Sequence, residues 1–290
     1  MIAFAAARGN RRTHAGGKSV RRVSIEQSFV WAQTFVRAEW RLLIPVALAF
    51  LALPLLLFEL LAPQWMTTAI TPPPPGATAA DLMARLSALP IALVILALSF
   101  LGSLAMTALA LLPGLSVAEA LVLAGRRVGI AIAAGFLIML ALVGFVIVAS
   151  LVLTLAGLGV PVQQGLLLGL LFGVGLVLWV RLVPLLPVIV ERRIGPIAAM
   201  RLSWNLTHGN FWRVLGALAL YLVGCTIVLL AVRTAIGTVL LLLTRAVGAA
   251  DLGPMLLAIL VRAVSALFSM GLAVLIVGFY RQLSTPRRAG

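Results

Sequence analysis

Long apolar runs, separated by short charged stretches, constrain this chain more than any other feature. Hydrophobic residues make up 63% of the 290 residues and charged residues only 10%, too few to cover the surface of a soluble globule. Runs of about 20 residues, the length that crosses the hydrocarbon core of a bilayer as a helix, recur six times. They cover 42–61, 89–112, 128–156, about 165 to the prolines Pro184 and Pro187, 214–243 and 255–280. The sequence therefore predicts an all-α polytopic membrane protein with six transmembrane helices.

Basic residues are distributed unevenly between the two sides of this membrane topology. The sequence has 22 Lys and Arg against 7 Asp and Glu, a net charge of +15. Seventeen of the basic residues lie in the tails or in every second loop, whereas Arg85 and Arg245 fall in the other loops. Basic loops stay in the cytoplasm, so we expect both termini there. The basic residues are not gathered into one domain, which excludes nucleic acid as the partner.

Short amphipathic segments precede every second apolar run. Ser24 and Ser116 begin two of them as helix caps, each followed three residues later by Gln or Glu. Gly195 and Pro196 begin the third as its cap and first helical residue. The third has an apolar face of Ala199, Leu202 and Leu206 and a polar face of Arg201, Asn205 and His208. We therefore expect three short helices on the cytoplasmic surface.

The chain divides into one membrane domain and two basic tails. Residues 1–23 predict a disordered tail, 24–283 a single six-helix domain, and 284–290 a second tail. Within the domain, a capped amphipathic segment followed by two spans recurs over 24–112, 115–190 and 195–280. A true internal repeat explains this pattern, and so does the ordinary alternation of any six-span protein, so both explanations stay open.

The most specific pattern is the run LVPLLPVIVERRIGPIAAMRLSWNLTHGNFWRVLG, residues 182–216. A span ending in Pro and Glu is followed by Gly-Pro, by a helix with Ala-x-x-x-Ser-Trp, and by a polar and basic re-entry. The run resembles the signature of the glycerophosphoryl diester phosphodiesterase membrane-domain family, and residues 116–127 resemble a weaker, earlier copy. The matching positions are Pro187, Glu191, Gly195, Pro196, Ala199, Ser203, Trp204, Asn205 and Arg213.

The resemblance implies a bacterial inner-membrane protein of roughly this topology. In some members the region precedes a soluble phosphodiesterase barrel, which has no counterpart in this sequence, so the family name implies no activity here. For the motif we favour a structural role. We expect Glu191 to pair with Arg201 or Arg213 and hold the surface helix to the end of the fourth span. Ser203 is expected to bond to a carbonyl and Trp204 to anchor at the headgroups.

The reactive residue types are too few for a catalytic centre or a metal site. Cys225 is the only cysteine, and His14 and His208 are the only histidines. No two acids lie three or four residues apart within a span, as an acid–base or metal-binding dyad on a helix requires. No phosphate-binding glycine loop is present. We therefore expect no enzyme, no metal and no cofactor.

Three arginines fall inside apolar runs. Arg233 and Arg262 lie ten and seven residues from the outer ends of their runs, roughly 15 and 10 Å deep. Two guanidiniums at that depth need an anion, such as Glu59 or a lipid phosphate. Alternatively, the spans end near the arginines, whose side chains then reach the interface. Arg181 has the same ambiguity on the cytoplasmic side, and its lipid or anion contact stays a hypothesis.

Three glycines repeat at four-residue spacing in the fourth run: Gly165, Gly169 and Gly173. Small residues at this interval let two helix backbones approach closely. We therefore expect them to form a packing face rather than a gate.

These observations favour a non-catalytic integral membrane protein, acting as a scaffold or in lipid or envelope homeostasis. The alternative is a transporter or lipid-handling protein with an arginine-lined cavity. The expected partners are membrane lipids, with anionic headgroups at the cytoplasmic face, and a membrane-protein partner or a second copy of the chain. A polar cavity with an arginine that no acid pairs would favour the alternative, whereas a bundle closed by the glycine face would favour a scaffold.

Overall fold

Every regular element in the described part of the chain is a helix. The structure is a computed structural model that describes residues 24–61, 89–157, 159–249 and 252–284, with the single positions 78 and 83. Six of its helices are long and apolar enough to span a bilayer, which confirms the predicted polytopic all-α fold. The predicted tail at 1–23, residues 285–290 of the predicted C-terminal tail, and most of the loop with Arg85 lie outside the described residues.

The first span is longer than its apolar run. Helix α1 (Ile25–Ala47) continues through a π-helical turn, η1 (Leu48–Ala52), into α2 (Leu53–Leu61). The predicted amphipathic segment is therefore the first part of this helix rather than a separate one. The two parts meet at Glu39, where the backbone leaves the helical region (φ −112°, ψ 17°). Ser24 caps the helix as predicted, accepting a bond from the Gln27 N–H.

The second amphipathic segment also joins its span. After α5 (Leu89–Leu111), helix α6 (Val117–Leu155) runs unbroken for 39 residues. Ser116 and Glu119 form the predicted capping box. Because nothing interrupts the helical hydrogen bonds after Arg127, the predicted boundary there does not exist. Helix α7 (Val160–Leu182) returns antiparallel to α6.

The third amphipathic segment is the one that forms a separate helix. After α7 come the short α8 (Leu185–Glu191) and then α9 (Pro196–Thr207). The fifth span consists of α10 (Phe211–Ala231), a second π-helical turn η2 (Val232–Ile236), and α11 (Gly237–Ala246). The sixth span is α12 (Leu252–Ser284).

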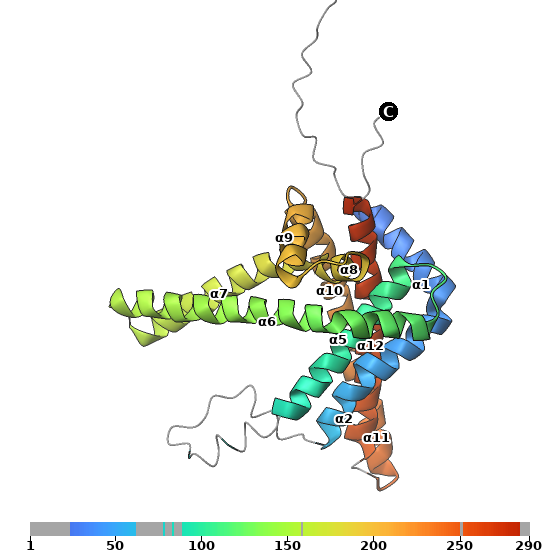
Figure 1. The fold of residues 1–290 in the computed structure, drawn as a ribbon. Coiled ribbons are helices and arrows are strands. Elements are labelled where there is room, and N and C mark those ends of the chain that lie inside the picture. Colours follow the sequence, from blue (N-terminus) through green and yellow to red (C-terminus); the bar gives the residue numbers. More distant parts are fainter. Residues whose placement is uncertain are drawn as a thin grey trace, which may run out of the picture.

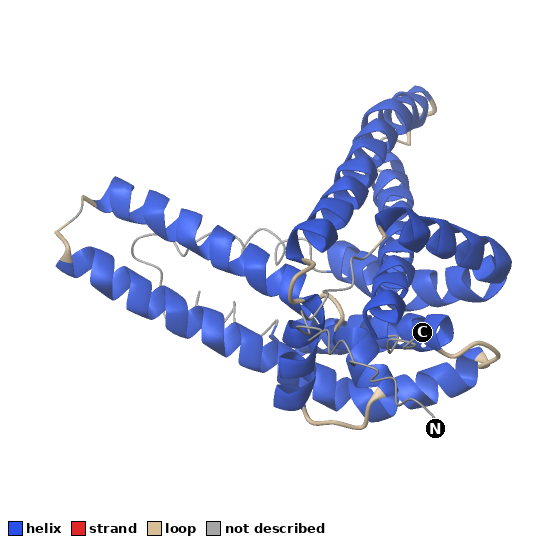
Figure 2. Ribbon diagram, turned by 90° about the horizontal axis from the view of Figure 1, so that it is seen from above, coloured by secondary structure: helices blue, strands red, loops and turns tan. Residues whose placement is uncertain are grey.

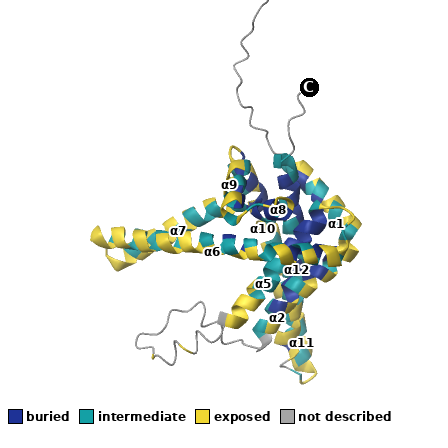
Figure 3. Cartoon of the chain, in the orientation of Figure 1, coloured by how far each residue is buried: buried dark blue, intermediate teal, exposed yellow. Residues whose placement is uncertain are grey.

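The core lies at one end of the bundle, which we call the closed end. Here the end of α12 meets the start of α1, the end of α5, and the helices α8 and α9 (Figure 1). The buried residues are concentrated in this region, as Figure 3 shows in dark blue. They include Leu43, Leu104, Met106, Val188, Ile189, Ala199, Leu218, Val274, Leu275, Val277 and Phe279.

The α6–α7 hairpin projects away from this core (Figures 1 and 2). The first half of α6 packs against the core through small residues, and Ala120, Ala124, Ala131 and Ala134 are buried there. Beyond them, large apolar side chains such as Phe136, Leu155 and Phe172 are exposed. A soluble protein could not expose this surface, but a lipid environment accepts it.

The predicted glycine packing face is wrong for contacts within the described chain. Gly165, Gly169 and Gly173 are exposed on α7, and a Cβ added at any of them would meet nothing within 4 Å. Close approach occurs instead at Gly102 and Gly271, where an added Cβ would lie 2.5 Å from Phe50 Cβ and 2.4 Å from Tyr221 Oη. Helix crossings decide which glycines are used, and spacing alone does not reveal the crossings.

Candidate functional site

The motif begins where the fourth span breaks at its two prolines. Pro184 lacks an N–H and precedes α8, and Pro187 is buried within α8. A proline ring clashes with the preceding turn, so α7 cannot continue straight through this region. Four residues after α8 ends at Glu191, Gly195 caps α9 and Pro196 is its first helical residue, as predicted. The motif therefore folds the chain back on itself at the closed end.

Helix α9 places two hydroxyl groups against the end of α7. Ala199, Ser203 and Thr207 are fully buried on its inner face. The Ser203 and Thr207 hydroxyls donate to the carbonyl of Arg181, at 3.0 and 3.3 Å. Carbonyls in the last turn of a helix lack intrahelical partners, and these hydroxyls act as hydrogen-bond donors to one of them. The predicted bond from Ser203 to a carbonyl exists, with its acceptor on a different helix.

The guanidinium of Arg181 lies between aromatic rings rather than beside an acid. Its central carbon is 5.1 Å from the ring of Trp204 and 5.8 Å from that of Phe211. Its Nε and Nη1 atoms are buried and make no hydrogen bond. Ring faces attract a cation, and N–H groups can point at them. Arg181 therefore joins α7, α9 and α10, and Trp204 contributes a cation–π contact at this junction.

Glu191 has a different partner from the two that we expected. Its carboxylate accepts a hydrogen bond from the hydroxyl of Tyr280, on α12. Among the described residues, no ion pair joins Glu191 to Arg201. Arg201 and Arg213, like Asn205, have exposed side chains. The outward polar face of α9 is as predicted, but the hydroxyl of Tyr280 holds Glu191 in place.

Two residues next to Tyr280 complete the closed end, and sequence reasoning missed both. Arg281 donates through Nη2 to the carbonyls of Ala110 and Leu111, at 2.9 and 3.0 Å, and so caps α5. Its central carbon also lies 4.7 Å from the ring of Trp31. Gln282 accepts from the Ser24 N–H at 2.9 Å and donates to the Ser24 carbonyl at 3.1 Å. The basic residue just after an apolar run was the available signal for Arg281.

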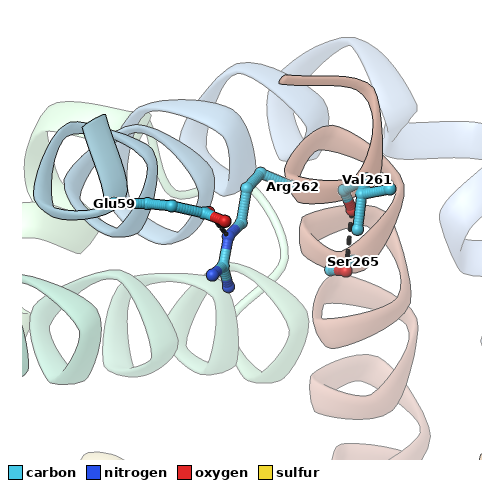
Figure 4. A network of polar contacts seen from close by, with 4 residues as sticks. All are labelled: Glu59, Val261, Arg262 and Ser265. Atoms are coloured by element: carbon cyan, nitrogen blue, oxygen red, sulfur yellow. Dashed lines mark hydrogen bonds and ion pairs between the residues drawn. The ribbon is translucent and has the colours of Figure 1, made fainter. Parts of the chain in front are cut away.

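The two other arginines of the apolar runs meet at a cavity away from the closed end. Arg262 Nε lies 2.7 Å from Glu59 Oε2, an ion pair between α12 and α2 (Figure 4). Arg233, on η2, lines the same cavity of about 420 Å³. It has no hydrogen-bond or ion-pair partner among the residues that the structure describes. Glu59 is one of the two anions that the sequence suggests for these arginines, and Arg262 is the one that contacts it.

The two regions have different chemical capacities. At the closed end, motif residues contact residues outside the motif: Glu191 bonds to Tyr280, and Ser203 and Trp204 contact Arg181. These contacts join α8 to α12 and α9 to α7. Among the described residues, the cavity is lined by two guanidiniums and one carboxylate, an excess of positive charge that suits an anion. Within the described ranges, no three His, Cys, Asp or Glu side chains gather as metal ligands would.

Comparison with known families agrees with the motif. The family model for the membrane domain of glycerophosphoryl diester phosphodiesterase matches residues 156–287. The predicted resemblance is therefore confirmed, and the matched range contains all nine motif positions together with Arg233 and Arg262. Glu59 and the weaker copy at 116–127 lie outside it. No curated protein and no solved structure matches the chain.

Proposed function

We propose that this multi-pass membrane protein is a non-catalytic module that binds anionic lipids, in the inner membrane of a bacterium. The closed end, with both termini, faces the cytoplasm. In this arrangement the motif holds the helices at the closed end, and arginines outside the packed core contact lipid phosphates. This role belongs to lipid handling or envelope homeostasis.

One observation supports the proposal above all others: most of the basic side chains have no protein acid to pair with. The chain has 22 Lys and Arg against 7 Asp and Glu. In the described part of the chain, Arg262 already pairs with one of these acids, Glu59. Arg192, Arg193 and Arg201 are exposed around α8 and α9. Anionic headgroups would neutralise such side chains, each contributing about 1 kcal/mol near a membrane surface.

Lipid composition tests this proposal. The full chain would be reconstituted in nanodiscs of pure phosphatidylcholine, or of phosphatidylcholine with roughly a third phosphatidylglycerol. We expect a higher thermal midpoint in the anionic discs, with the gain reduced at high salt because ions screen surface charge within about 3 Å at 1 M. The variant R192Q/R193Q/R201Q should lose much of the gain.

The matched control is N205A/H208A, which changes exposed polar residues of α9 without removing an arginine. It should keep the full gain in anionic discs. Equal thermal midpoints of the unmodified chain in both lipids would reject the lipid-binding function.

A second candidate, transport, is favoured by the cavity beside Arg233. It predicts flux of a small anion into liposomes that contain the protein. A scaffold instead predicts a protein partner that is recovered with the chain in mild detergent. Flux without a partner would support transport over a scaffold.

A further inference from the structure

The cavity near Glu59 combines charge with apolar walls. Glu59, Arg233 and Arg262 reach it from α2, η2 and α12. The remaining walls come from the start of α12 and are Pro254, Leu257, Ala258 and Val261. Its volume of about 420 Å³ is within the usual range of small-ligand sites. It has room for a headgroup-sized anion beside the arginines.

The charges in the cavity do not cancel. Figure 4 shows the side chains of Glu59 and Arg262 pointing toward one another, and the ion pair uses Nε of the arginine. The terminal nitrogens of Arg262 have no partner among the described residues, and neither has Arg233. Within the described lining, one carboxylate thus faces two guanidiniums, leaving donors that match the oxygens of a phosphate.

The two arginines lie about one hydrocarbon thickness away from the closed end along their helices. Helices α10 and α12 are antiparallel neighbours, joined by the bond from the Tyr221 hydroxyl to the Phe268 carbonyl. Arg233 follows Phe211 by 22 residues and Arg262 precedes Tyr280 by 18, or about 33 and 27 Å along the helices. The hydrocarbon core is about 30 Å thick. With the aromatic closed end at one interface, both guanidiniums reach the other.

Arg233 also sits in an irregular part of its helix. It belongs to the π-helical turn η2, which interrupts an otherwise continuous α-helix. Such turns are rare and occur often at functional sites. At the adjacent Gly237, an added Cβ would lie 3.0 Å from Leu257 of α12. The turn and this close packing position the guanidinium at the cavity wall.

We propose that the cavity is a binding site for a phosphate group, held by Arg233 and by the terminal nitrogens of Arg262. This inference rests on the proposed lipid-binding function and specifies one site for it. The phosphate can belong to a phospholipid headgroup in the leaflet opposite the closed end, or it can be free inorganic phosphate. Glu59 pairs with Nε of Arg262, and its negative charge opposes the binding of an anion at this site.

Lipid retention tests the site directly. The full chain in neutral detergent would be titrated with phosphatidylglycerol, and bound lipid counted by native mass spectrometry. R233Q keeps the Glu59–Arg262 pair, and we expect its affinity to fall about tenfold, as loss of a charge-assisted hydrogen bond implies. R245Q removes an exposed arginine from α11 outside the cavity and should bind as the unmodified chain does.

The variant E59Q tests whether loss of the carboxylate raises or lowers the affinity for phosphatidylglycerol. Removing the carboxylate removes a negative charge that repels the phosphate, so phosphatidylglycerol affinity should rise several-fold even if the thermal midpoint without lipid falls. If Glu59 were merely structural, E59Q would lose stability and lipid together. A loss of lipid affinity in E59Q would therefore overturn the proposal.

Inorganic phosphate distinguishes the two sources. If it raises the thermal midpoint of the unmodified chain but not of R233Q, the site takes free phosphate. If only phosphatidylglycerol acts in this way, the site requires the lipid. Either result supports the proposal.

Failure of the site and failure of the function give different results. Equal binding of phosphatidylglycerol by R233Q and the unmodified chain would reject the site while leaving the lipid-binding function intact. Equal losses in R233Q and R245Q would have the same meaning, because they would indicate nonspecific attraction. Absence of phosphatidylglycerol binding by the unmodified chain would reject both.

Discussion

At the scale of single residues, polar side chains at the closed end bond to helices far from them in sequence. Arg281 on α12 caps the carbonyls of Ala110 and Leu111, 171 and 170 residues away. A cation at a helix C-terminus also interacts favourably with the helix dipole. The same guanidinium stacks on Trp31, so it connects α1, α5 and α12. One side chain thus stabilises the meeting point of three helices.

Replacing Arg281 should therefore weaken the whole closed end. We expect R281Q to lower the free energy of unfolding by about 2 kcal/mol, the usual contribution of hydrogen bonds from a charged donor. R281K keeps the charge but loses the planar fork, and it should restore part of the loss. Chemical denaturation in mixed micelles measures both. The control R193Q alters an exposed arginine and should change little, and an equal effect of R193Q and R281Q would refute this role.

The hydroxyls on α9 provide a second test at residue scale. Ser203 and Thr207 both donate to the Arg181 carbonyl. S203A should cost about 1 kcal/mol or less, because Thr207 still satisfies that acceptor. T207A should behave similarly, whereas S203A/T207A leaves the carbonyl without these donors and should cost more than the two single changes together. Strictly additive losses in the same denaturation assay would contradict shared bonding.

At the scale of elements, the crossing points of helices give glycines their different roles. Gly102 on α5 faces Phe50 in η1 so closely that an added Cβ would lie 2.5 Å from Phe50 Cβ. Gly169 on α7 has open space where a Cβ would be. The two glycines are alike in sequence context, since each lies within an apolar run. Only the neighbouring helix distinguishes them.

Alanine substitutions should separate the two cases. G102A forces α5 away from η1 and should cost about 1–3 kcal/mol, the usual effect of overpacking. G169A should be neutral or stabilise α7 by up to about 1 kcal/mol, because alanine favours helix. Thermal unfolding in detergent, with the oligomeric state measured alongside, checks both. Destabilisation or dissociation by G169A would show that another chain packs on the α7 glycines.

At the scale of the whole molecule, the ends of the described chain meet. Ser24 and Gln282 are joined by hydrogen bonds, so the start of the first span and the end of the last span lie side by side at the closed end. An even number of spans puts both ends on one side of the membrane, and helix packing brings them into contact. The α6–α7 hairpin extends from the same core, and α6 with 39 residues is about 58 Å long. That length exceeds a bilayer core of about 30 Å, so α6 tilts or extends beyond it.

Labelling of single cysteines tests this topology. In a C225A background, S284C and R126C should react with a membrane-impermeant maleimide only after the cytoplasmic side is opened. G157C, at the turn between α6 and α7, should react from outside in intact cells. Positions S284C and G157C reacting from the same side would show that the hairpin does not cross the membrane.

The sequence by itself determined the spans, the helix caps and the exposed polar face of α9. Each depends on neighbours within one helix: about 20 apolar residues suffice for a span, and a cap forms within one turn. The six spans, the Ser116–Glu119 box, and Gly195 with Pro196 were predictable for this reason. The family motif was also readable, because its residues are contiguous.

The tertiary structure alone decided which side chains meet. Glu191 bonds to Tyr280, 89 residues away, a partner that its position in the sequence does not indicate. Arg262 pairs with Glu59, 203 residues away. Arg233 lines the same cavity and has no partner among the described residues. Such contacts depend on how helices cross and rotate against one another. Hydropathy is nearly uniform around these helices, so the sequence pattern contains little information about their rotation.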